Sequence, residues 1–364
     1  MLEGRKDRPK GLTLIHAADL HLDSAFVGFP PEQRKYLMEA QASIPERIGE
    51  CCRSQNADML LLAGDVFDGP YRRETARALA ETLEDCSVPV FIAPGNHDFL
   101  GLDSPWEREN WPDNVHIFRG NLSYVDLPEL KTRVYGGGFT AMDCPGLLDH
   151  FRAERVFPHT LAVLHGDTTS PKSPYNPITS AQLISSGLDY VALGHIHQAG
   201  SLHAGSTLCA WPGCPMGRGW DETGSRGILK VTLGKKVHLS PIGLGLPRFF
   251  TESLSLDEGL DALDRLLPSS ECQDFYRVTL TGRGEADIPA LLKKYTGPAY
   301  LEFRNRTKPK RELWDCIGED SFQGVFFDLL HGALEQADPQ EAETIRLAAE
   351  LSRRILDGEE VELP

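Results

Sequence analysis

The sequence lacks a long apolar run, an internal repeat and a long low-complexity tract. No stretch approaches the roughly 20 apolar residues that a membrane-spanning helix needs. Residues 1–10 are polar and contain no apolar core of the kind found in signal peptides, so we expect a short disordered lead-in. These absences predict a cytoplasmic protein without a membrane span.

The eight cysteines do not form a disulfide or zinc-binding pattern. Cys51 and Cys52 are adjacent, and Cys209 and Cys214 lack the CxxC spacing of zinc knuckles and redox motifs. We therefore expect reduced, mostly buried thiols, as is usual in the cytoplasm.

Basic residues are outnumbered by acidic ones, with 37 Lys and Arg against 53 Asp and Glu and a formal net charge of −16. Proteins that bind duplex DNA usually show a basic footprint, so this balance disfavours DNA binding by charge alone. Part of the excess of acidic residues is explained if some of their carboxylates bind metal cations, which cancel the negative charge.

Apolar segments alternate with helix-compatible segments in the first hundred residues. Strands are expected at residues 11–18, 59–63 and 88–94, and helices at 32–53, with an interruption near Ile44–Pro45, and at 72–84. Fully apolar strands separated by helices predict a parallel sheet covered on both faces. Further short strands are expected at residues 115–118, 122–127, 132–136, 160–164, 188–193, 207–210, 227–233 and 237–241. Two such sheets with helices outside them predict an α/β fold of four layers, αββα.

We expect four consecutive regions along the chain. They are a disordered N-terminus at 1–10, a main domain at 11–245, a βαβαβ unit at 249–310 with helices at 256–267 and 287–295, and a helical hairpin within 311–364. The second helix of the hairpin is predicted from Asp338 at the N-cap, Pro339 at the first helical position and Gly358 just past its end.

Chemically reactive side chains follow five of the predicted strands. They are Asp19 and His21; Asp65 and Asp68; Asn96, His97 and Asp98; His165; and His195 with His197. Open α/β sheets bind ligands at the carboxyl ends of their strands, and residues two apart on a strand point the same way. Taken alone, Gly95–Asp98 is equally compatible with a turn in which Asn96 and Asp98 bond to backbone groups. Five such strand ends in one chain favour a metal centre, because Asp, Asn and His suit divalent metals such as Mn, Fe or Zn.

The motifs DxH, GDxxD, GNHD, a single His and GHxH occur in this order between Leu12 and Ile242, and the chain resembles the calcineurin-like metallophosphoesterases. The resemblance implies two divalent metals, with Mn favoured over Fe and Zn. It assigns Asp19, His21 and His197 to one metal, Asn96, His165 and His195 to the other, and Asp65 to a bridge between them. It also places His97 beside the scissile phosphate, with Asp98 orienting it.

Two cations about 3.5–4 Å apart would hold a phosphate and lower the pKa of a water molecule that attacks it in line. His97 would stabilise charge or protonate the departing oxygen. Asp68 is expected to hydrogen-bond the metal ligands; the alternative is that it caps the following turn.

Further segments resemble the SbcD-type DNA repair exonucleases, including the YhaO-like bacterial proteins. They are residues 16–23 (HAADLHLD) and 211–219 (WPGCPMGRG), the latter with Cys214 where the family usually has Ser. This resemblance implies a capping domain at 249–310, a C-terminal region that engages an SMC-like ABC-type ATPase, and a homodimer. The predicted function is metal-dependent exonuclease or endonuclease activity on DNA in DNA repair.

Four arginines are candidates for DNA contacts. Arg218 and Arg226 lie in or beside the segment that follows GHxH, which we expect at the rim of the active site. Arg304 and Arg306 belong to a basic stretch at 304–311 that suits DNA phosphates or, equally, a solvated linker.

Two other functions are compatible with the motifs. A phosphodiesterase for nucleotides or lipid-linked nucleotides shares the metal ligands, but such enzymes generally lack so large a C-terminal extension. A catalytically silent DNA-tethering scaffold is disfavoured because His97 and Asp98 are intact.

Overall fold

The computed structural model describes residues 11–309 and 312–358. The predicted disorder at 1–10 and the basic residues at 310 and 311 lie outside the described residues. The chain forms two compact units. The first holds the described parts of Met1–Glu252, Leu266–Val278 and Tyr295–Glu302, and the second holds those of Ser253–Arg265, Thr279–Lys294 and Phe303–Pro364. The domain boundaries expected from the sequence stay a prediction.

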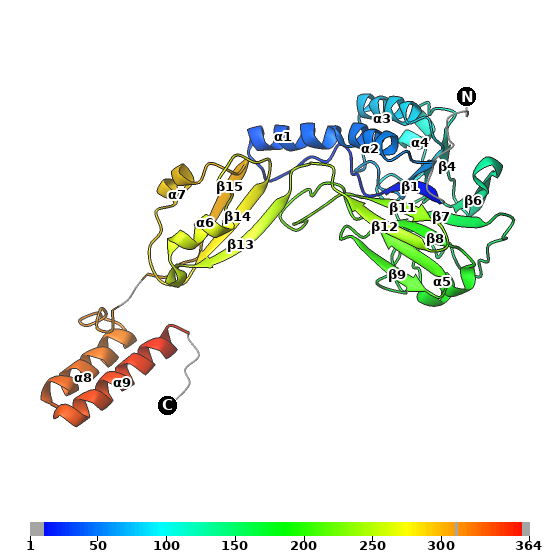
Figure 1. Cartoon of the computed structure of the whole chain (residues 1–364). Helices are drawn as coiled ribbons and strands as arrows, with labels where there is room; N and C mark the ends of the chain where they lie inside the picture. The colour runs from blue at the N-terminus through cyan, green and yellow to red at the C-terminus, as the bar shows by residue number, and fades with distance from the viewer. Residues whose placement is uncertain (1–10, 310–311, 359–364) are drawn as a thin grey trace. The chain divides into compact units, whose positions relative to one another are not determined.

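The first unit contains a six-stranded sheet with the order β12-β11-β1-β2-β3-β4 (Figure 1). Its strands are β1 (Leu12–Ala17), β2 (Met59–Leu62), β3 (Val90–Ile92), β4 (Val115–Ile117), β11 (Ile228–Leu233) and β12 (Val237–Ile242). Strands β1 to β4 are parallel, as their apolar runs predict. Strand β11 pairs antiparallel with both β1 and β12, so the later chain returns to extend the sheet.

A second six-stranded sheet has the order β5-β6-β7-β8-β10-β9. Its strands are β5 (Ser123–Leu127), β6 (Thr132–Gly136), β7 (His159–His165), β8 (Tyr190–Gly194), β9 (Gly200–Ala204) and β10 (Thr207–Trp211). The inner strands β6, β7, β8 and β10 are parallel, and β5 and β9 are antiparallel edges. Strand β9 was not expected, because its alternation of exposed and more buried residues is short, begins with Gly200 and lies between two turns.

Three apolar layers hold these sheets and their helices together. Between the sheets, Leu14 and Leu61 pack in one cluster with Leu161 and Tyr190. Helices α2 (Ile44–Ser54) and α3 (Arg73–Asp85) bury their apolar sides on the outer face of the first sheet. Helix α5 (Ser180–Ser186) covers the second sheet through Leu183. The predicted four-layer αββα arrangement is confirmed (Figure 1).

The helix breaks follow from local residues. Helix α1 (Pro31–Ala42) ends at Ser43, and α2 begins directly after it with Pro45 in its first turn, where a missing backbone N–H costs nothing. Helix α5 begins at a capping box formed by Thr179 and Gln182 and ends at Gly187, whose φ of 72° favours glycine. The short α4 (Pro105–Arg108) lies between β3 and β4.

A third sheet has the order β13-β14-β15, with strands β13 (Phe249–Ser255), β14 (Phe275–Thr281) and β15 (Tyr300–Asn305). Helix α7 (Ile288–Lys294) lies within the predicted helix at 287–295. The continuous helix predicted at 256–267 is wrong. That segment forms the 3-10 turns Leu256–Glu258 and Leu260–Ala262 and the four-residue α6 (Leu263–Leu266). Gly259, with φ 87°, separates the two turns and interrupts the helical backbone.

The second unit ends in the predicted helical hairpin of α8 (Phe322–Gln336) and α9 (Pro339–Leu356). The Asp338 carboxylate accepts from the backbone N–H groups of Gln340 and Glu341 at 2.9 Å each, which confirms it as the N-cap of α9. Among the helices of residues 11–309 and 312–358, none has the length and apolarity to cross a membrane.

Candidate metal centre

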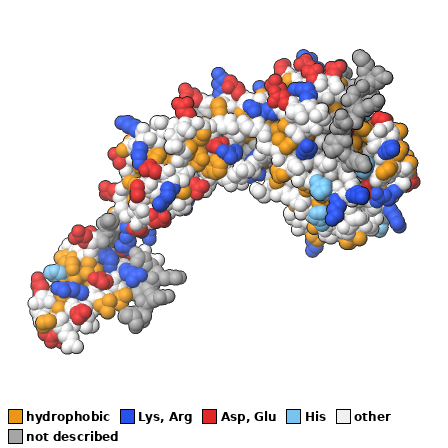
Figure 2. All heavy atoms as spheres, in the orientation of Figure 1, with side chains coloured by type: hydrophobic (Ala, Val, Ile, Leu, Met, Phe, Trp, Pro, Cys, Tyr) orange, Lys and Arg blue, Asp and Glu red, His pale blue; other side chains and the backbone are white. Residues whose placement is uncertain are grey.

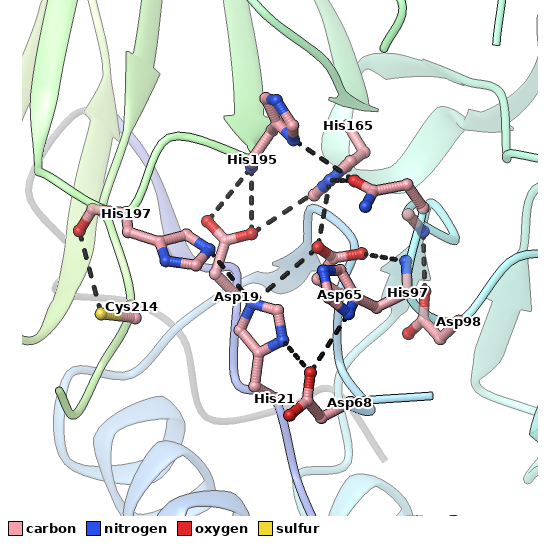
Figure 3. A network of polar contacts seen from close by, with 12 residues as sticks. Asp19, His21, Asp65, Asp68, His97, Asp98, His165, His195, His197 and Cys214 are labelled. Carbon is pink, nitrogen blue, oxygen red and sulfur yellow. Dashed lines mark hydrogen bonds and ion pairs between the residues drawn. The ribbon is translucent and has the colours of Figure 1, made fainter. Parts of the chain in front are cut away.

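The five strand ends singled out in the sequence meet at one place (Figure 3). Strands β1, β2 and β3 deliver their residues from the first sheet, and β7 and β8 deliver theirs from the second. Both sheets have parallel inner strands, so each collects its carboxyl ends at one edge. The seven predicted metal ligands all lie in this cluster: Asp19, His21, Asp65, Asn96, His165, His195 and His197.

One set of ligands consists of Asp19, His21 and His197, whose ligand atoms all lie within 4.8 Å of one another. The Nε2 atoms of His21 and His197 are 3.1 Å apart. Asp19 accepts hydrogen bonds from the backbone N–H of His195 through both oxygens, at 3.0 and 3.1 Å. This bond fixes the carboxylate between strands of the two sheets.

The other set centres on the Asn96 side-chain oxygen. Its Oδ1 lies 3.0 Å from Nε2 of His165 and 3.3 Å from Nδ1 of His195. Asp65 connects the two sets, because its Oδ2 lies 3.8 Å from Nε2 of His21 and 3.4 Å from Nε2 of His165. A single carboxylate oxygen is thus in reach of a ligand from each set, as a bridging role requires.

The hydrogen-bond pattern tests whether cations fit this cluster. The Nδ1 atoms of His21 and His197 face the carboxylates of Asp68 and Glu222 at 3.2 and 2.6 Å, which favours the tautomers with the proton on Nδ1. In the neutral imidazoles both Nε2 atoms then present lone pairs to each other, which is unfavourable without a cation or proton between them. Nδ1 of His165 likewise faces the backbone oxygen of Ala63 at 3.0 Å, so in the neutral imidazole Nε2 carries the lone pair. The donor set therefore fits divalent cations, which would supply Lewis acidity toward a phosphate and a water molecule.

Burial and opposing charges shift the ionisation of this cluster. Burial opposes charge on His165, but the carboxylate of Asp65 prevails and raises the pKa of His165 to about 9. Burial, followed by the positive charge of His165, lowers the pKa of His195 to about 4, so His195 is neutral and free to ligate. Asp65 itself is buried, yet His165 and His21 hold its pKa below the usual range. The centre thus combines a protonated His165 and a neutral His195 with nearby carboxylates, and His165 would give up its proton to bind a cation.

Four ligands have left-handed backbone conformations that L-residues seldom adopt. They are Asp19 (φ 52°), His21 (φ 46°), Asp65 (φ 49°) and His195 (φ 93°). Such conformations cost on the order of 1–3 kcal/mol each and concentrate at functional sites. They turn the chain sharply at the strand ends and aim these side chains at the cluster.

His97 is held by Asp68, which corrects the prediction for Asp98. Nδ1 of His97 lies 3.1 Å from Oδ1 of Asp68, the same oxygen that faces Nδ1 of His21. Asp98 instead accepts backbone N–H bonds from Gly95 at 2.7 Å and from Val66 and Phe67 at 2.8 and 3.2 Å. Asp98 therefore ties the β3 loop to the β2 loop, while Asp68 orients the imidazole.

Asp68 lies 3.2 Å from Nδ1 of His21, one of the candidate metal ligands. Its Oδ2 also accepts from the Ser24 hydroxyl at 2.7 Å, which fixes the carboxylate. Burial opposes its charge, but hydrogen bonds from His21 and His97 keep the pKa of Asp68 far below the usual range. The same bond to Asp68 raises the pKa of His97 above its ordinary value.

Sequence reasoning missed Glu222. Its Oε1 lies 2.6 Å from Nδ1 of His197, and its carboxylate also accepts from the side chain of Arg218 at 3.0 Å. The available signal was its place shortly after the segment 211–219, which carries the resemblance.

The four candidate DNA contacts lie in different settings. The guanidinium of Arg218 lies 3.4 Å from Asp68 and so borders the metal centre. The guanidinium of Arg226 bonds to the backbone oxygens of His197 and Thr223, which braces its own loop. Arg304 and Arg306 are exposed residues of the second unit. Their contacts with DNA stay a prediction.

Comparison with known proteins agrees with this centre. Residues 12–199 match the family model for calcineurin-like phosphoesterases. This range contains β1 to β8 and all seven candidate metal ligands.

Three curated relatives share part of the sequence. The chain is 35% identical to the uncharacterized metallophosphoesterase YhaO of Bacillus subtilis, covering 61% of this chain and 58% of that protein. It is 24% identical to one component of the nuclease SbcCD of the same species, covering 58% and 64%, respectively. It is 25% identical to the DNA double-strand break repair protein Mre11 of Aeropyrum pernix, covering 55% and 52%. The chain spans less than two thirds of each of these relatives. The family match covers more than half of the chain, so this protein belongs to the calcineurin-like phosphoesterases.

Proposed function

We propose that this protein is a Mn-dependent DNA nuclease that acts in DNA repair in the cytoplasm, together with an SMC-like ATPase. The observation that carries the catalytic part is the contrast between His97 and the metal ligands. The side chain of His97 is 43% exposed, whereas those of His21 and His165 are 0% exposed. The side chain of His197 is 28% exposed, so His97 is the most exposed histidine of the cluster and the one that a substrate reaches most readily.

The chain's own groups suit phosphodiester cleavage. The bond from Asp68 keeps His97 protonated to higher pH, so Nε2 of His97 can donate a proton to a departing oxygen. Arg218 adds a fixed positive charge beside Asp68, which favours an anionic phosphate. Carboxylate, amide and imidazole donors together favour Mn, with Fe and Zn as the other candidates.

The DNA part of the proposal is supported by the similarity to a component of a nuclease and to a DNA repair protein. The exposed apolar residues of helix α8 support the proposal of an ATPase partner. Residues Phe322, Val325 and Leu329 follow helical spacing and are 75%, 56% and 71% exposed; Figure 2 shows hydrophobic side chains on the surface of this region. An apolar stripe of this kind marks an interaction surface, and we propose the ATPase as its occupant.

The nuclease experiment uses the full chain with Mn on end-labelled single- and double-stranded DNA. Cyclic dinucleotides and a small aryl phosphodiester are tested in parallel. His97→Ala is the inactive control, and His150→Ala, which changes an exposed histidine, is the matched control. We expect the wild type and the matched control to cleave DNA and His97→Ala to lose cleavage.

Two results would overturn this proposal. Fast hydrolysis of the small diesters with DNA left intact would identify a small-substrate phosphodiesterase. Full metal loading without hydrolysis of any phosphodiester, with or without the ATPase, would identify a DNA-tethering scaffold.

The partner experiment first looks for a gene for a coiled-coil ATPase beside this gene and then measures co-purification of that ATPase with the full chain. Leu329→Glu places a charge on the apolar stripe and should abolish binding. Gln336→Ala, on the same helix, should not. Equal binding by both variants, or no such ATPase gene, would reject the partner.

A further inference from the structure

The loop after β10 forms a set of contacts behind His197 that the ligand pattern does not explain. Glu222 is almost fully buried and uses both of its oxygens. Oε1 faces Nδ1 of His197 at 2.6 Å and Nη2 of Arg218 at 3.0 Å. Oε2 accepts from the backbone N–H of Arg218 at 2.7 Å and from the thiol of Cys214 at 3.7 Å. A carboxylate held at four points cannot rotate away from the histidine.

The loop that carries Glu222 is itself fixed. Gly217 comes so close to the Glu222 backbone oxygen that a Cβ atom there would collide with it. Gly224 donates its backbone N–H to Phe249 at 2.9 Å, and Met216 is buried in the core of the first unit. Glu222 is thus presented to His197 by a rigid segment.

We propose that Glu222 is a positioning residue for the metal centre: it fixes His197 in the tautomer and orientation that direct Nε2 at the cation shared with Asp19 and His21. Carboxylates that accept the second N–H of a metal-bound histidine set its tautomer and raise its basicity. Arg218 completes the arrangement, because it bonds to Glu222 with one Nη and lies 3.4 Å from Asp68 with the other.

A continuous chain of contacts follows. It runs from His197 through Glu222 and Arg218 to Asp68, whose Oδ1 faces both His21 and His97. Glu222 therefore orients His197 and Asp68 orients His21, which belongs to the same ligand set. Arg218 contacts both carboxylates and so connects them. This inference concerns the metal centre itself and holds for any phosphoester substrate, so the failure of the DNA proposal would leave it standing.

The test measures metal binding rather than turnover. Metal-free full-length protein is titrated with Mn²⁺ and followed by electron paramagnetic resonance. In the wild type we expect two ions with the signal of a spin-coupled pair. In Glu222→Ala we expect the ion at His197 to bind about 10- to 100-fold more weakly, which leaves the signal of a single uncoupled ion at low Mn²⁺.

Glu222→Gln keeps an oxygen that can accept from His197, so it should weaken binding less than Glu222→Ala does. Asp221→Asn removes an exposed carboxylate next to Glu222 and is the matched control, with wild-type binding expected. If Glu222→Ala fails to fold, as judged by circular dichroism, Glu222→Gln carries the test with a smaller weakening. Two ions bound with wild-type affinity and coupling in either folded Glu222 variant would overturn the proposal.

Discussion

Nδ1 of His97 lies 3.1 Å from Oδ1 of Asp68, a residue 29 positions earlier in the chain, although Asp98 is its neighbour in sequence. The bond joins the loop after β3 to the loop after β2. The carboxylate of Asp98 accepts hydrogen bonds from three backbone N–H groups instead, so the two aspartates have different roles. Asp68 controls the proton of His97, and Asp98 holds the two loops together.

Replacing Asp68 with Asn should therefore change the pH dependence of the rate. The Asp68 carboxylate raises the pKa of His97, so the wild type keeps His97 protonated to higher pH. In Asp68→Asn the loss of rate with rising pH should begin at lower pH, and the rate should fall roughly 10²–10⁴-fold where His97 is deprotonated. The measurement is a pH profile of hydrolysis with saturating Mn. Asp103→Asn, which changes an exposed aspartate, is the control, and identical profiles for Asp68→Asn and wild type would contradict the assignment.

Asp65 and His97 should separate metal binding from chemistry. Asp65→Ala removes the carboxylate between the two ligand sets and should weaken metal binding by more than the roughly 10- to 100-fold typical of outer partners. His97→Ala should keep both metals and lose nearly all of the rate. Metal content after gel filtration, measured for both variants, checks this division. Equal depletion in the two variants would rule it out.

The sequence predicted the parts of this centre that depend on strand ends. Apolar runs that stop at Asp19, Asp65 or His165 are visible without a structure, and parallel strands bring their ends together. The partners of these residues were not visible. Glu222 lies 25 positions from His197 on an irregular loop, and Asp68 rather than Asp98 reaches His97 because the β2 loop folds back.

The dependence on tertiary contacts also explains where the predicted secondary structure was wrong. Strand β9 and the broken helix at 256–267 are short segments shaped by tertiary contacts and by Gly259, so period and propensity alone assign them poorly.

Gly95 should tolerate no side chain. A Cβ atom there would lie 2.6 Å from the backbone N of Asp65 and would collide with its carboxylate. Gly95→Ala must therefore displace the residue that connects both ligand sets, so we expect loss of metal together with a lower unfolding temperature. Gly101→Ala is the matched control, because its Cβ would meet only the Phe99 ring at 3.6 Å. Wild-type metal content in Gly95→Ala would show that the loop can move aside.

His16 links the two sheets in the interior of the first unit. Its Nδ1 lies 2.8 Å from the hydroxyl of Tyr190, which joins β1 to β8 in the interior. Burial lowers the pKa of His16 to about 3, against a smaller opposing effect of the Leu193 backbone. The folded protein therefore holds a neutral imidazole at a pH where the unfolded chain, with a histidine pKa of about 6.5, takes up a proton.

The consequence is a stability that falls in acid. Between about pH 6.5 and pH 3 the unfolded state binds one more proton at this site than the folded state, so the His16 contribution is complete above pH 6.5 and is lost as the pH falls. The free energy of unfolding should lose up to about 1.4 kcal/mol per pH unit from this group.

His16→Gln should be less stable than wild type at pH 7.5, by about 1–3 kcal/mol, because the Tyr190 hydroxyl loses its partner. Its stability should nevertheless decline less steeply in acid. Denaturant unfolding at several pH values, with a chelator present throughout, measures both slopes, and His238→Gln at an exposed position should keep the wild-type slope. Parallel slopes for wild type and His16→Gln would mean that His16 takes up its proton without unfolding the sheets.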